Sequence, residues 1–166
     1  MLRAVYPGSF DPVTSGHLDI IERAANVFDG VVVAVAVNME KKPLFTVEER
    51  VEMLRSACGH LRNVQVDYFG GLLVDYVEKQ QARVVVKGLR AISDFEFELQ
   101  MALMNKRLNE NVETLFMMTS AEHSFLSSGM VKELAEFGVT LTGLVPPCVE
   151  QKLTDKIEKT KREAQR

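Results

Sequence analysis

A short stretch near the N-terminus gathers residues from which a phosphate-binding loop can be built. Residues 6–17 read Tyr-Pro-Gly-Ser-Phe-Asp-Pro-Val-Thr-Ser-Gly-His, and they lie between an apolar run and an apolar-periodic segment. That order predicts a strand, a tight loop and a helix. Gly8 and Gly16 let the backbone approach a ligand closely, and the free N–H groups that open the helix form an anion site. His17, in the first turn of that helix, can donate a hydrogen bond to a phosphate held there.

Further polar residues follow other predicted strands. Lys41, residues 87–90 and the pair Ser127 and Ser128 each come after an apolar run or after the loop that follows one. Because the loops after parallel strands meet at one edge of a sheet, we expect these groups to join the first loop. Cationic groups, hydroxyls and helix-terminal amides in a chain of net charge -3 predict a polyphosphate site. Taken alone, the pair Lys41 and Lys42 is more typical of a solvated loop.

The elements that must position these residues alternate between strand and helix patterns, which predicts an α/β fold: a doubly wound, five-stranded parallel sheet with right-handed crossovers. The β-branched run at 30–37 is typical of a strand covered on both faces. Predicted helix caps are Thr46, Ser127 or Ser128, and Asp94. The expected strands are 2–6, 30–37, 64–69, 83–87 and 112–118, and the expected helices are 18–28, 46–58, 72–81, 95–108, 127–138 and 147 onwards.

Composition favours one domain over residues 1–166, with the charged end at 155–166 solvated or frayed. A pI of about 5.7 argues against nucleic acid or an anionic membrane as a partner. Without a signal-peptide pattern or an apolar run of about 20 residues, the sequence favours the cytoplasm. Cys58 and Cys148 lack metal-ligand spacing, so we expect buried thiols.

Four motifs, in order, carry a family resemblance across nearly the whole chain. Residues 14–17, Thr-Ser-Gly-His, match the (T/H)xGH signature of the nucleotidylyltransferase superfamily, and residues 6–12 resemble its bacterial phosphopantetheine adenylyltransferase branch. Similar to that branch are also Lys-Lys-Pro-Leu-Phe-Thr-Val-Glu-Glu-Arg at 41–50, Lys-Gly-Leu-Arg-Ala-Ile-Ser-Asp-Phe-Glu-Phe-Glu at 87–98, and Ser-Phe-Leu-Ser-Ser at 124–128.

The resemblance implies a Rossmann-like nucleotidylyltransferase fold and a specific reaction. AMP would pass from ATP to 4'-phosphopantetheine by direct in-line displacement, giving dephospho-coenzyme A and pyrophosphate in coenzyme A biosynthesis. The resemblance also implies Mg²⁺ as cofactor, a homohexamer and feedback inhibition by coenzyme A. No metal ligand from the protein is assigned.

Residue roles carried over from the family fall into three sets. The catalytic set would be His17, which stabilises the transition state, with Lys41 and Arg90. Contacts to 4'-phosphopantetheine would come from Ser9, Lys41, Leu73 and Lys87. Contacts to ATP would come from Ser9, Phe10, His17, Gly88, Leu89, Arg90, Glu98, His123, Ser124, Phe125, Leu126, Ser127, Ser128 and Gly129.

The residues agree with this chemistry, with two departures from the family pattern. A phosphomonoester acceptor is already anionic, so the reaction needs alignment and positive donors rather than a general base. Magnesium would screen the β- and γ-phosphates, and Asp11 is as well explained by a turn-forming hydrogen bond as by metal contact. Lys87 stands where the family has arginine, so charge is kept but the bidentate fork is lost. Gly129 replaces a hydroxyl residue.

Two other functions fit parts of the sequence. A sister enzyme that adenylylates nicotinamide or nicotinate mononucleotide would share the first motif and the serine turn, but residues 41–43 and 87–90 favour the phosphopantetheine branch. A non-catalytic adenine-nucleotide sensor on the same fold would bind ATP and release no pyrophosphate. The intact Gly16 and His17 pair argues against that sensor.

Overall fold

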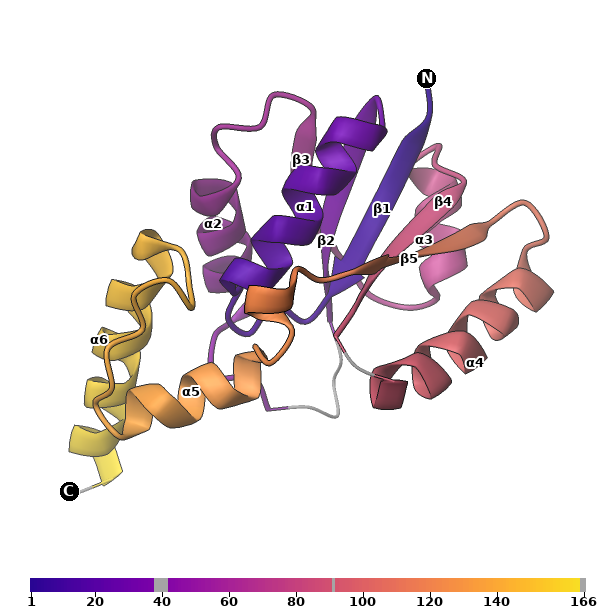
Figure 1. The fold of residues 1–166 in the computed structure, drawn as a ribbon. Coiled ribbons are helices and arrows are strands. Elements are labelled where there is room, and N and C mark those ends of the chain that lie inside the picture. The colour runs from indigo at the N-terminus through magenta and orange to yellow at the C-terminus, as the bar shows by residue number, and fades with distance from the viewer. Residues whose placement is uncertain (38–41, 91, 165–166) are drawn as a thin grey trace.

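The computed structural model describes residues 1–37, 42–90 and 92–164. At its centre is a parallel sheet of five strands in the order β3-β2-β1-β4-β5 (Figure 1). The predicted doubly wound α/β fold is therefore confirmed. The strands are β1 (Arg3–Gly8), β2 (Gly30–Ala36), β3 (Val64–Phe69), β4 (Val84–Leu89) and β5 (Glu113–Met118). The helices are α1 (Ser15–Val27), α2 (Val47–Ala57), α3 (Leu73–Lys79), α4 (Ile92–Leu108), the 3-10 turn η1 (Ala121–His123), α5 (Ser128–Glu136) and α6 (Pro147–Ala164).

The strand order reverses at β1, which pairs with β2 on one side and with β4 on the other. Helices α1 and α2 cover one face of the sheet, and α3 and α4 cover the other (Figure 1). Helices α5 and α6 extend the first layer, and α6 packs against α2. In such a sheet, the carboxyl ends of the two strands at the reversal leave a crevice between their loops.

The central strands are buried on both faces, as the β-branched run at 30–37 predicts. On β2, Val31, Val33 and Val35 face the α1–α2 layer, while Val32 and Ala34 face α3. All five are at most 1% exposed. Burial of each valine side chain is worth about 1.5–3 kcal/mol relative to exposure, so this strand forms a rigid support for the loops at its end.

Two helices on the α1–α2 face begin with reciprocal caps. Helix α1 begins at Ser15, with His17 in its first turn as predicted, because Thr14 accepts from the His17 N–H while the His17 side chain accepts from the Thr14 N–H. The predicted capping box of α2 is confirmed between Thr46 and Glu49. Both caps satisfy backbone groups that a helix terminus leaves unpaired.

The later helices include one wrong cap prediction. Helix α4 begins at Ile92, so Asp94 lies inside the helix and is not its N-cap. The cap of α5 is confirmed at Ser127, whose Oγ accepts from the Met130 N–H at 3.0 Å. Gly138, with φ of 72°, follows the end of that helix in the left-handed conformation that glycine adopts without strain.

The C-terminal helix α6 is anchored along one side. Val149, Leu153 and Ile157 recur every four residues and are buried in the main core. Lys156 lies 2.7 Å from the Glu49 carboxylate and 5.6 Å from the centre of the Phe45 ring. The helix therefore rests on the start of α2. Its charged residues 158–163 are exposed.

Two smaller predictions concern the thiols and the membrane. Cys58 is buried and Cys148 half-buried, and both are free. The exposed His60 lies 2.8 Å from the Glu22 carboxylate. Across the described ranges, no helix combines the length and apolar character needed to cross a membrane.

Candidate functional site

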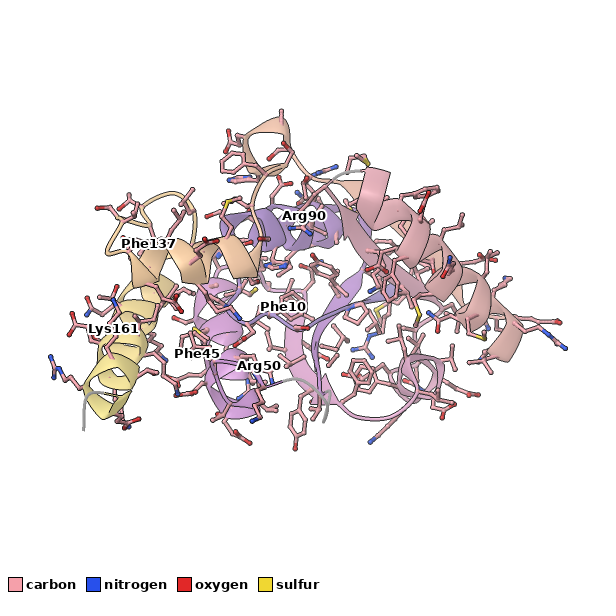
Figure 2. The ribbon with its side chains drawn as sticks, turned by 90° about the horizontal axis from the view of Figure 1, so that it is seen from below. Phe10, Phe45, Arg50, Arg90, Phe137 and Lys161 are labelled. Carbon is pink, nitrogen blue, oxygen red and sulfur yellow. The ribbon has the colours of Figure 1, made fainter. Side chains whose placement is uncertain are left out.

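A cavity of about 520 Å³ opens at the carboxyl ends of β1 and β4, where the strand order reverses. The first loop, the end of β4, helix α4 and the turn before α5 contribute to its walls. In Figure 2, which views this edge of the sheet, Phe10 lies between Arg90 and Arg50. Among the predicted site residues, those in the walls are Ser9, Phe10, His17, Lys87, Gly88, Arg90, Glu98, His123, Leu126, Ser127 and Ser128.

Several other predicted residues do not line this cavity. Leu89 is buried in β4, Phe125 is exposed, and Leu73 packs partly against the core on the α3 face. Ser124 and Gly129 also lie outside the walls. Lys41 falls outside the described residues.

The neighbour of Lys41 borders a second cavity. Lys42 lines a space of about 340 Å³ that shares Ser9 and Ser128 with the main cavity. Lys132 and Arg50 lie in the same walls. Cationic side chains therefore flank the first loop on the side away from β4.

The His17 ring is held by its own helix cap. Its Nδ1 lies 3.0 Å from the Thr14 backbone N–H, which can only donate, so Nδ1 is an acceptor. The proton of the neutral ring then sits on Nε2, at the other edge of the ring. Phe10 packs edge-to-face on His17 with ring centres 5.2 Å apart. Backbone and aromatic contacts thus fix both the tautomer and the orientation.

The electrostatic surroundings keep His17 neutral. Burial, and after it the nearby Arg90 guanidinium, lowers the pKa of His17 from 6.5 to about 4. At neutral pH the ring therefore offers a neutral N–H donor rather than a charged imidazolium. A donor held in place before the ligand arrives is the kind of group that stabilises charge as it develops.

The shape of the first loop depends on Phe10. This residue has φ of 47°, and its ring is 1% exposed at the base of the loop. A Cβ at Gly8 would lie 2.9 Å from that ring, so a side chain at position 8 has no room. The loop backbone is thus held close to the cavity.

Three residues that carry no predicted binding role hold the first loop to its neighbours. The buried Asp11 carboxylate accepts from the backbone N–H groups of Leu44 and Phe45, each at 2.9 Å, and lies 2.9 Å from the Lys132 ammonium. Arg50, 4% exposed, donates to the Ser9 carbonyl at 2.9 Å. Asp11 therefore bonds distant backbone, rather than forming a local turn.

These ties set the charge of Asp11. Burial alone would raise its pKa, but the two backbone N–H groups and Lys132 outweigh burial and hold the pKa below the usual 3.8. Asp11 is therefore ionised at neutral pH. Sequence reasoning missed Lys132 and the tie made by Arg50, because each partner is far away in the chain.

On the opposite side of the cavity, Lys87 and Glu98 form an ion pair, although the family resemblance assigns Lys87 to 4'-phosphopantetheine and Glu98 to ATP. The Lys87 ammonium, from β4, lies 3.1 Å from the carboxylate of Glu98 on α4. Arg90 donates to the Leu126 carbonyl at 2.9 Å and so ties the end of β4 to the turn before α5. A phosphate bound at Lys87 would share its ammonium with Glu98.

The turn before α5 closes the remaining side. The Ser128 hydroxyl donates to the Pro12 carbonyl at 2.8 Å, which ties this turn to the first loop. His123 is half-buried, and its Nδ1 lies 2.8 Å from the Ser120 hydroxyl. Three of the four predicted motifs thus line the main cavity, and the motif at 41–50 lines the adjoining cavity through Lys42, Pro43 and Arg50.

Comparison with known proteins agrees with this geometry. Residues 5–134 match the family described as cytidylyltransferase-like. The phosphopantetheine adenylyltransferase of Heliobacterium modesticaldum is 58% identical over 98% of this chain and 96% of its own length. That of Clostridium kluyveri is 57% identical over 96% of this chain and 95% of its own length. The chain belongs to the phosphopantetheine adenylyltransferase family.

Two solved structures share the fold of this phosphopantetheine adenylyltransferase family member at low sequence identity. A structure from Vibrio parahaemolyticus, described as a nicotinate-nucleotide adenylyltransferase, has a TM-score of 0.71 at 18% identity and covers 95% of each chain. A lipopolysaccharide core biosynthesis protein from Thermoplasma volcanium has a TM-score of 0.52 at 20% identity and covers 72% of this chain and 97% of its own. At these identities the likeness is one of fold alone.

Proposed function

We propose that this chain transfers AMP from ATP to 4'-phosphopantetheine, giving dephospho-coenzyme A and pyrophosphate. The observation that carries the proposal is the single cavity in which the first loop, His17, the end of β4 and the Ser127–Ser128 turn meet. Relatives that are 52–58% identical and named phosphopantetheine adenylyltransferase support the same reaction.

The reaction is a direct displacement at the α-phosphorus of ATP. An oxygen of the acceptor phosphate forms the new bond, and the bond to pyrophosphate breaks on the opposite side. The acceptor is already an anion, so no side chain has to remove a proton. The obstacle is repulsion between the attacking, central and leaving phosphates, which fixed donors lower.

The site residues divide that work between them. His17 donates from Nε2 to an α-phosphate oxygen, where negative charge grows during displacement. Ser9 and the first-loop amides hold the nucleotide phosphates, with Phe10 below them. Lys41 and Lys87 bind the acceptor phosphate, while Leu73 borders the pantetheine arm. The remaining ATP contacts are Gly88, Leu89, Arg90, Glu98 and residues 123–129.

Magnesium enters in this proposal together with ATP. In the part of the chain that the structure describes, no group of three or more His, Cys, Asp or Glu side chains could hold a metal ion. Mg²⁺ that arrives with ATP would take phosphate oxygens and water as its ligands and would supply charge screening at the β- and γ-phosphates.

Assembly, regulation and location complete the proposal. Met101, Leu103 and Met104 are 41%, 63% and 55% exposed on α4. Their exposure supports a subunit contact and, with the family resemblance, a homohexamer. Coenzyme A, which contains the product, acts as feedback inhibitor, and the protein works in the cytoplasm.

Pyrophosphate release tests the proposed reaction. Magnesium-ATP is offered with 4'-phosphopantetheine or nicotinate mononucleotide in parallel, and His17→Ala serves as the inactive control. We expect release with phosphopantetheine alone. Release with the mononucleotide instead would overturn the acceptor, and ATP binding without release in either arm would favour a nucleotide sensor.

A further inference from the structure

The hydroxyl of Tyr6 is a polar group in the cavity wall that the proposed mechanism does not use. Tyr6, on β1, is 5% exposed, and it forms part of the wall of the main cavity. Within residues 1–37, 42–90 and 92–164, its hydroxyl has no hydrogen-bond partner. The hydroxyl of a tyrosine this deeply packed usually finds a partner, and for Tyr6 the cavity is the place from which one can come. This hydroxyl thus lacks its partner where a ligand would bind.

A comparison with the chain's other buried tyrosine makes the difference plain. Tyr76, on the α3 face, donates its hydroxyl hydrogen to the Asp67 carboxylate at 2.8 Å. The Tyr6 ring is held edge-to-face against Phe10, with ring centres 5.4 Å apart. Tyr6 is therefore as firmly packed as a core tyrosine, but only its ring is satisfied by the protein.

The surroundings of the Tyr6 hydroxyl place it beside the end of β4. A Cβ built on Gly88 would lie only 3.3 Å from the hydroxyl oxygen, so the lack of a side chain lets the β4 backbone come close to the hydroxyl. Gly88 lines the same cavity and is a proposed contact to ATP. The proposed phosphate contacts are the first-loop amides and His17. They follow the end of β1, whereas Tyr6 lies within that strand.

The charges that act on the hydroxyl indicate what it can bind. Burial raises the pKa of Tyr6, and the Glu98 carboxylate raises it further, outweighing Arg90. The group is therefore a neutral donor near a carboxylate, in a wall that also carries Lys87 and Arg90. A ribose hydroxyl suits this place because it can accept from Tyr6 and donate to a carboxylate such as Glu98, which an ionised phosphate oxygen cannot do.

We propose that the Tyr6 hydroxyl binds a ribose hydroxyl of ATP and thereby contributes to selection of ribonucleotides. This inference rests on the proposed function, because that function places the nucleotide beside Gly88. The ribose carries the neutral hydroxyl groups of ATP. Tyr6 acts in ground-state binding, at a distance from the displaced phosphorus.

Binding titrations test the inference without requiring turnover. ATP, 2'-deoxy-ATP and 3'-deoxy-ATP are titrated with Mg²⁺ into the unaltered protein and into Tyr6→Phe, which keeps the ring and removes the unpaired oxygen. We expect the unaltered protein to bind one deoxy analogue about tenfold more weakly than ATP. Tyr6→Phe should bind ATP and that analogue with equal affinity, about tenfold weaker than the unaltered protein binds ATP.

Tyr76→Phe is the matched control, since it removes a buried phenol outside the cavity. It should leave the affinity ratios of the three nucleotides unchanged. Circular dichroism and a thermal melt check that each variant folds, and Tyr6→Met provides a second variant without the hydroxyl. Unchanged ATP affinity in Tyr6→Phe, or equal weakening of all three nucleotides, would overturn the inference.

The outcomes also separate this inference from the proposed function. If the unaltered protein releases no pyrophosphate with phosphopantetheine, the proposed function fails, while the titrations still report on the ribose contact. If it does release pyrophosphate but binds ATP and both deoxy analogues equally, the ribose contact alone is refuted. That last result needs no variant at all.

Discussion

Polar side chains on the two sides of the cavity differ in how they are paired. The loop–α5 side is formed by Asp11, Arg50, Ser128 and Lys132. Each of these four side chains makes a hydrogen bond or ion pair to another part of the protein. On the β4–α4 side, Lys87 pairs with Glu98, and the hydroxyl of Tyr6, in the same cavity wall, has no partner among the described residues. The first side is organised before ligands bind, and the second completes its contacts through them.

This difference has a kinetic meaning. Groups that are fixed in advance act on the transition state and should appear in kcat. Groups that depend on a ligand for their contacts should appear in KM. Variants on the two sides can therefore strengthen or break the comparison.

The largest effect is expected for His17→Ala. Loss of one preorganised donor costs about 100- to 1000-fold in kcat in comparable sites, and ATP binding should largely persist because the contact strengthens in the transition state. Steady-state kinetics with a separate ATP titration measure this. His60→Ala, at an exposed histidine, is the matched control. Near-normal kcat in His17→Ala would contradict the assignment.

The next effect is a loss of stability when a bond that holds the loop–α5 side is removed. Asp11→Asn removes the charge that holds Lys132 and leaves one backbone N–H facing an amide donor. We expect a loss of about 2–4 kcal/mol in the free energy of unfolding. Urea unfolding measures it, and Asp155→Asn, at an exposed residue, is the control. A loss below about 0.5 kcal/mol would show that these ties do not stabilise the loop.

The pH dependence of this loss follows from the charge of Asp11. Its folded-state pKa lies below 3.8, so the unfolded chain binds more protons as the pH falls past that value. The stabilisation is therefore complete at pH 6 and disappears below about pH 3.8. Unfolding of the unaltered protein and of Asp11→Asn across this range should converge in acid. A constant difference would show that Asp11 stabilises through shape alone.

A smaller effect is expected on the β4–α4 side. Lys87→Ala should raise the KM for 4'-phosphopantetheine about tenfold and the KM for ATP much less, because it removes one charge-assisted contact. Lys87→Arg should keep the low KM, and Lys159→Ala, on exposed α6, is the control. Equal effects on both substrates would place Lys87 outside the acceptor site.

The last prediction concerns the pH at which the His17 ring is protonated, and no reaction rate is measured. The His17 ring should remain neutral, with its proton on Nε2, until the pH approaches about 4, whereas exposed His60 serves as the reference in the same spectrum. Nitrogen-15 NMR of labelled imidazoles reports both the tautomer and the midpoint. A midpoint near 6.5 for His17 would mean that its burial does not control its charge.

The fold and the main elements of the site could be predicted from the sequence because their signals are local. The run at 30–37 requires burial on both faces, and the Thr46 to Glu49 spacing defines a helix start. Loops after parallel strands share one edge, which is why Ser9, Lys87 and Ser128 could be expected to meet.

The missed contacts depend on residues that no local pattern connects. Asp11 and Lys132 are 121 positions apart, and Arg50 and Ser9 are 41 apart. The start of α4 was placed too late because Asp94 looks like a cap, although the helix already begins at Ile92. Tyr6 had no signal of its own, since only a packed cavity reveals an unpaired hydroxyl.

The packing of α6 against α2 affects how cooperatively the protein folds. Lys156 bonds the Glu49 carboxylate, which also closes the cap of α2, and α2 carries the Arg50 that holds the first loop. Release of α6 would therefore loosen the cap of α2 and the support of Ser9 in one event. The smallest unit that unfolds as a whole thus extends beyond residue 134, where the family match ends.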